Sequence, residues 1–132
     1  MKKAYVACII VLMALTAQAE KAPKIFDGEH LLKGVNAIVA SQDKSREVVG
    51  EELDLAFSTL DYLAGYRDAL DILTVASFST ESRIELRKLN TGRIGIFQMA
   101  RIVQKYLLAN PERLHSVQQV LIYEALKAAS IP

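Results

Sequence analysis

The sequence is poor in cysteine and contains no tryptophan. Its single cysteine, Cys8, lies within an apolar N-terminal run. A chain that loses this run keeps no thiol, so it forms neither a disulfide nor a thiolate nucleophile. Its two histidines, His30 and His115, have no ligand partner three or four residues further on, and no zinc site is expected. The stability of the domain must therefore come from packing.

The chain also lacks an excess of either charge. It has 16 Lys and Arg residues against 15 Asp and Glu residues, which gives a formal net charge of +1. Nucleic-acid binders need a basic surplus to contact phosphates, so this class of protein is not expected. With 132 residues, 52% of them hydrophobic, and only three Pro and six Gly, the composition is typical of one small folded domain.

The first 19 residues have the pattern of a secretory signal peptide. Lys2 and Lys3 precede an apolar run over residues 4–15, and Ala17-Gln18-Ala19 forms an A-x-A cleavage site. The run is shorter than the roughly 20 residues that a membrane-spanning helix needs. We therefore expect residues 1–19 to be removed on export, leaving a slightly acidic domain of residues 20–132 without a membrane anchor. An uncleaved N-terminal anchor is the alternative.

Apolar residues recur at helical spacing in four segments, and no segment alternates as strands do. We predict main helices over residues 27–41, 51–75 and 96–109, and a last helix from Pro111 almost to Pro132. Asp27 and Asn110 are expected to cap the first and the last of these helices. The expected fold is all-α, a small single-domain bundle of about four main helices with a long connection before the third.

The second predicted helix carries an apolar and an acidic stripe. The apolar stripe, expected to face the core, consists of Leu53, Phe57, Leu60, Ala64 and Leu70. Asp54, Asp61 and Asp68 recur every seven residues and form either a solvated face or a strip that meets a basic partner. Gly65 is expected to permit close helix packing.

The connection over residues 76–95 is long for so small a domain. Ser82-x-x-Glu85 resembles a capping box, so we expect a short helix within it. Long connections are often functional, and exposed polar loops on a rigid scaffold are common recognition sites. A solvated basic loop is the alternative. The candidate partner-binding residues are Ser79, Glu81, Arg83, Arg87, Asn90 and Arg93.

No constellation of catalytic residues is recognisable. Ser41-x-x-Lys44 matches the S-x-x-K pattern of penicillin-recognising enzymes, but neither companion motif follows it. Gly92-x-x-Gly95 lacks the preceding strand and the Lys-Ser/Thr ending of a phosphate-binding loop. We therefore expect a protein that is not an enzyme, needs no cofactor or metal, and acts by binding.

Several short motifs follow one another along the chain. They are Gly28-Glu29-x-Leu31-Leu32, Tyr62-x-x-Gly65-x-x-Asp68-Ala69, Gln98-x-x-x-x-Val103-x-x-Tyr106-Leu107, Asn110-Pro111-Glu112-Arg113-Leu114-His115 and Ala125-Leu126. Together with the signal peptide, their order and spacing resemble those of the type VI secretion amidase immunity proteins and the related resistance-associated immunity proteins.

The resemblance implies a small helical periplasmic protein, commonly a homodimer. Such a protein binds a peptidoglycan amidase effector and blocks its cleft with a loop or helix end, here expected to be the connection over residues 76–95. Family members typically carry cysteines that are missing here, so packing or a dimer interface must replace disulfides that commonly contribute about 2 to 4 kcal/mol each. The alternative function is that of a periplasmic chaperone or adaptor that shields apolar surfaces of client proteins.

Overall fold

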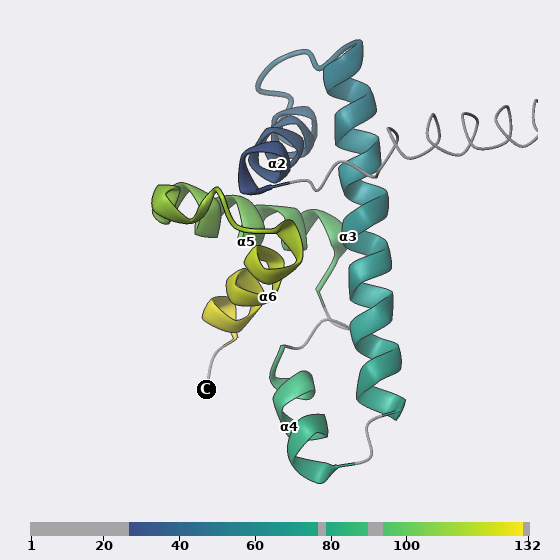
Figure 1. Ribbon diagram of the computed structural model, residues 1–132. Helices are drawn as coiled ribbons and strands as arrows, with labels where there is room; N and C mark the ends of the chain where they lie inside the picture. Colours follow the sequence, from purple (N-terminus) through teal and green to yellow (C-terminus); the bar gives the residue numbers. More distant parts are fainter. Residues whose placement is uncertain (1–26, 77–78, 90–93, 131–132) are drawn as a thin grey trace, which may run out of the picture.

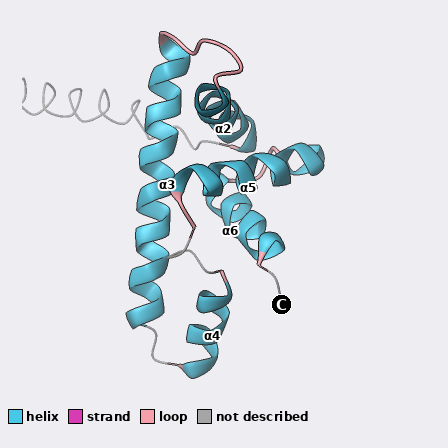
Figure 2. Cartoon of the chain, turned by 180° about the vertical axis from the view of Figure 1, so that it is seen from behind, coloured by secondary structure: helices cyan, strands magenta, loops and turns pink. Residues whose placement is uncertain are grey.

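The computed structural model describes residues 27–76, 79–89 and 94–130, and all regular elements in this part are helical (Figures 1 and 2). The predicted all-α fold is confirmed, whereas the predicted signal peptide, residues 1–19, lies outside the described residues. None of the described helices has the length and apolar character required to span a membrane. The elements are α2 (Gly28–Asp43), α3 (Glu51–Ala76), α4 (Thr80–Lys88), α5 (Ile96–Ala109), the 3-10 helix η2 (Pro111–Arg113) and α6 (Gln118–Ala129).

The ends of α2 are fixed by local hydrogen bonds. Asp27 is its N-cap, as predicted, and accepts a hydrogen bond from the His30 amide at 3.0 Å. At the other end, Lys44 adopts a left-handed conformation with φ 51°, and its amide donates to the carbonyls of Ala40 and Ser41. The chain then turns at Gly50, where φ is 61°, and enters α3.

Four helices meet in one hydrophobic core, with α5 packed against α2, α3 and α6 (Figure 1). Val35, Leu63, Leu107 and Leu121, one residue from each of these helices, are completely buried. The four helices correspond to the four main helices predicted from the sequence. The predicted short helix is α4, but it starts at Thr80, so Ser82 lies inside it and is not its cap.

The buried face of α3 differs from the predicted one. Of the predicted stripe, Leu70 is buried but Phe57 is exposed, and the core face is instead made by Ala56, Thr59, Leu63 and Leu70. Gly65 was also wrongly assigned, because a Cβ atom added there would have open space around it. The acidic stripe of α3 is exposed along its length, as a solvated face requires.

The last helix begins later than predicted. Pro111 starts only the short η2, and α6 begins at Gln118. The Gly28 amide donates to the carbonyls of Leu114 and Ser116 at 2.8 and 3.1 Å, which holds the intervening chain against the start of α2 and interrupts the helix. Asn110 precedes η2, but its side chain makes no capping hydrogen bond to that helix. The side-chain amide of Asn110 instead donates to the Tyr106 carbonyl at the end of α5.

A polar cluster joins α5, η2 and α6. The Tyr106 hydroxyl donates to Glu124 Oε2 at 2.8 Å, and Arg113 donates to Glu124 Oε1 at 2.7 Å. The hydrogen bond from Tyr106, followed by the hydrogen bond and charge of Arg113, holds the pKa of Glu124 below its ordinary value. The cluster therefore favours the ionised form of Glu124 in the folded state.

This cluster predicts a pH dependence of stability. A glutamate with a lowered pKa stabilises the fold above the pKa of the unfolded chain, about 4.3, and this contribution is lost as the pH falls through the lower pKa of the folded state. We expect Glu124→Gln to lower Tm modestly at neutral pH and to weaken the dependence of Tm on pH below about 4.3. Thermal unfolding across the acid range measures both effects. Parallel curves for the two proteins would contradict the prediction.

Candidate protein-binding site

The end of α3 and the whole of α4 project beyond the core. Both views show α4 beside the last turns of α3 and away from α2 (Figures 1 and 2). We call residues 70–76 together with residues 79–89 the α3–α4 hairpin. Leu70 and Leu89 are buried and Leu86 is half-buried, so these leucines anchor the hairpin to the rest of the fold.

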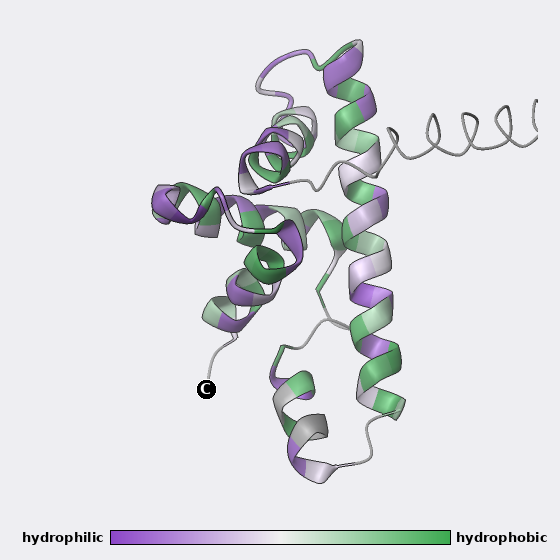
Figure 3. Ribbon diagram, viewed as in Figure 1, coloured by the Kyte–Doolittle hydropathy of each residue, from purple (hydrophilic) through white to green (hydrophobic). Residues whose placement is uncertain are grey.

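The hairpin exposes large aliphatic side chains. Val75 is 80% exposed and Ile84 is 51% exposed, and Ile72 and Leu73 are also exposed. Figure 3 shows this apolar character at the end of α3. Single exposed aliphatic residues are ordinary, but a group of them on one projecting element is typical of a surface that contacts another molecule.

The structure brings most of the predicted partner-binding residues onto this hairpin. Ser79, Glu81 and Arg87 are exposed at or within α4. Arg83 belongs to α4 as well, but its side chain lies outside the described part, as do Asn90 and Arg93. Within the predicted connection, residues 80–88 form the helix α4, which lies beside the last turns of α3 (Figures 1 and 2).

The charges of α4 also stabilise the helix itself. Glu81 lies in its first turn, and Arg87 and Lys88 lie in its last turn. Acidic residues near the N-terminus and basic residues near the C-terminus of a helix interact favourably with its dipole. This arrangement supports a short helix that packs mainly against α3.

Sequence reasoning missed the aliphatic residues of the hairpin. Leu70, Ile72, Leu73 and Val75 follow one another too closely to share one face of a helix. That crowding was the available signal that some of them remain exposed.

The described residues contain no group of three or more His, Asp or Glu side chains placed to hold a metal ion.

The chain matches no model of a known protein family, and no significantly similar curated protein or solved structure was found.

Proposed function

We propose that this protein is a periplasmic immunity protein, a homodimer, that binds a type VI secreted peptidoglycan amidase and occludes its active site with the α3–α4 hairpin. The observation that carries the proposal is the projection of this hairpin from the core with exposed aliphatic and charged side chains together. A narrow projecting element can enter an enzyme cleft, whereas a flat helical face cannot.

The composition of the hairpin suits an interface with a dry centre and a polar rim. Ile72, Val75 and Ile84 would lose contact with water on binding, and Glu81 and Arg87 would lie at the edge and orient the partner. Blocking the entry of substrate is sufficient for protection, so the chain itself needs no catalytic group.

Replacing Ile84 by serine tests the proposal. We expect Ile84→Ser to weaken binding to the amidase at least about tenfold, or about 1.4 kcal/mol, because the partner loses an apolar contact at the centre of the interface. Isothermal titration calorimetry with an amidase encoded beside this gene measures the change. Ile84 is already 51% exposed, so the variant should fold normally.

Leu108→Ser is the matched control. Leu108 is 60% exposed near the end of α5, outside the hairpin, and its replacement should leave the affinity unchanged. Failure of the wild-type protein to bind any cell-wall amidase encoded beside its gene would refute the proposal. An affinity of Ile84→Ser equal to that of the wild type would exclude the hairpin from the interface, and equal losses in both variants would show that the effect is not specific to the hairpin.

A chaperone or adaptor function is the second candidate, because exposed aliphatic residues such as Leu73 and Val75 also suit unfolded clients. An immunity protein forms one tight complex of fixed stoichiometry. A chaperone instead suppresses the aggregation of unrelated proteins. Light scattering of heated client proteins, with and without this protein, separates the two functions.

A further inference from the structure

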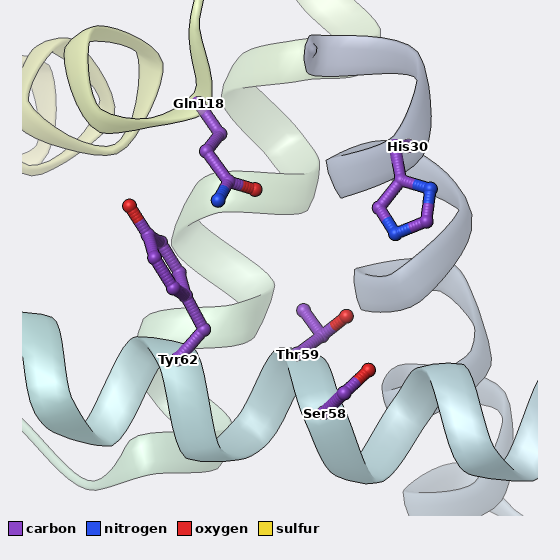
Figure 4. Close-up of a pocket in the computed structure, with 5 residues that line it drawn as sticks. All are labelled: His30, Ser58, Thr59, Tyr62 and Gln118. Carbon is purple, nitrogen blue, oxygen red and sulfur yellow. The ribbon is translucent and has the colours of Figure 1, made fainter. Parts of the chain in front are cut away.

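Two polar side chains in the described part of the chain are buried, and both line the same pocket. Thr59 is 6% exposed and Gln118 is 8% exposed. The pocket lies where α2, α3 and the start of α6 meet, and it has a volume of about 120 Å³ (Figure 4). We call it the Gln118 pocket; His30, Ser58 and Tyr62 complete its lining.

Contacts between distant parts of the chain hold the pocket together. Thr59 packs so closely against α2 that a Cβ atom at Gly34 would lie 2.0 Å from its Oγ1 atom. The bridge between Asp27 and Val117 fixes the start of α6 beside the start of α2. Gln118, the first residue of α6, therefore reaches the space above Tyr62 of α3 (Figure 4).

The polar groups of the pocket include donors and acceptors. Burial raises the pKa of Tyr62, and hydrogen bonding from the nearby Gln118 side chain opposes this rise. The Tyr62 hydroxyl can donate one hydrogen bond and accept others. The carbonyl oxygen of the Gln118 side chain remains an acceptor.

Thr59 contributes its methyl group to the pocket. Its Oγ1 atom lies against Gly34 of α2, where a Cβ atom would be only 2.0 Å away, and Figure 4 shows the hydroxyl turned toward α2. The hydrogen-bonding groups offered to a ligand are therefore those of Gln118 and Tyr62.

We propose that the Gln118 pocket binds an acetamido group. Among the described residues, no Asp, Glu, Lys or Arg lines the pocket, so a charged group would lose its hydration without a counter-ion from these side chains. An amide instead supplies an N–H for the Gln118 carbonyl and a C=O for the Tyr62 hydroxyl. Its methyl group packs on the Tyr62 ring and the Thr59 methyl. A volume of about 120 Å³, the share of about four liquid water molecules, suits a group of this size.

The rest of the ligand has room beside the pocket. His30 also lines a wider groove of about 520 Å³ between α2 and the start of α3, where Lys33 and Glu51 provide charges of both signs. The acetamido group is therefore the buried end of a larger polar molecule. Both N-acetylated sugars and N-acetylated peptides carry this group.

Titrations followed by NMR test the proposal with the protein purified from cells that produce the full chain. N-methylacetamide should shift the Gln118 side-chain amide signals saturably, with a Kd in the millimolar range expected for so small a ligand. Comparing the affinities of N-acetylglucosamine and glucosamine tests whether the ligand is an acetylated sugar. Comparing those of N-acetylalaninamide and alaninamide tests whether it is an acetylated peptide. The acetylated member of the matching pair should bind at least about tenfold more tightly than its amine.

Gln118→Met removes the amide of the pocket, and Gln119→Met changes the exposed neighbouring side chain as a matched control. We expect the first variant to bind N-methylacetamide at least about tenfold more weakly and the second to bind like the wild type. If Gln118→Met unfolds, Tyr62→Phe removes only the donor hydroxyl and should also weaken binding. Absence of saturable shifts, equal binding of amines and acetylated ligands, or equal affinities of the Gln118 and Gln119 variants would overturn the proposal.

Discussion

Replacing Leu107 by alanine is expected to lower the free energy of unfolding by about 2–5 kcal/mol. Leu107 is completely buried on α5, the helix that packs against α2, α3 and α6. Removal of its side chain loses the transfer free energy of several carbon atoms and leaves a cavity that the surrounding helices fill only in part. Urea denaturation followed by circular dichroism measures the change.

The neighbouring residue provides a matched control. Leu108 lies on the same helix but is 60% exposed, so Leu108→Ala should change the free energy of unfolding by no more than about 0.5 kcal/mol. The same side chain is removed in both variants, and only the environment differs. Similar losses of stability in the two variants would mean that α5 does not face the core as described.

The sequence was sufficient to predict α5 because this helix has one apolar stripe. Its apolar residues recur at helical spacing, and four of the five are buried while Ile96 is half-buried; they are Ile96, Met99, Ala100, Val103 and Leu107. The residues between them include Arg101 and Lys105, which cannot be buried without partners. Helical periodicity therefore determined both the element and its orientation.

The orientation of α3 could not be predicted in the same way. Apolar residues of α3 occur on all sides of the helix, so their spacing does not show which side faces the core. Whether Phe57 or the polar Thr59 is buried depends on where α3 crosses α2. Only a glycine at position 34 allows Thr59 to approach so closely. The face of α3 was therefore set by a contact between residues distant in sequence, which periodicity does not report.

The two candidate sites also differ in whether local sequence patterns or contacts between distant residues determine them. The length of the connection between α3 and α5 was visible in the sequence, and it led to residues of α4 such as Glu81 and Arg87. The Gln118 pocket was not visible, because its lining comes from α2, α3 and the start of α6. In addition, the start of α6 was predicted several residues too early, so Gln118 was not placed at a helix end.

Replacing Gly34 by alanine is expected to destabilise the fold by about 1–3 kcal/mol. The new Cβ atom would lie 2.0 Å from Thr59 Oγ1, 2.9 Å from its Cβ and 3.0 Å from its Cγ2. Rotation of the Thr59 side chain moves the hydroxyl but leaves the Cβ atom in place, so α2 and α3 must separate. This cost exceeds the gain of at most about 1 kcal/mol that alanine brings to a helix interior.

Gly65→Ala is the control for helix propensity, because a Cβ atom at Gly65 of α3 would meet nothing within 4 Å. We expect it to stabilise the protein by about 0.5–1 kcal/mol. Combining Gly34→Ala with Thr59→Ala should recover part of the lost stability, since the hydroxyl and the methyl group in the closest contacts are then gone. Thermal unfolding of the three variants measures these differences. Stabilisation by Gly34→Ala equal to that by Gly65→Ala would show that α2 and α3 do not cross closely at Gly34 and Thr59, and that the Gln118 pocket is not closed by this contact.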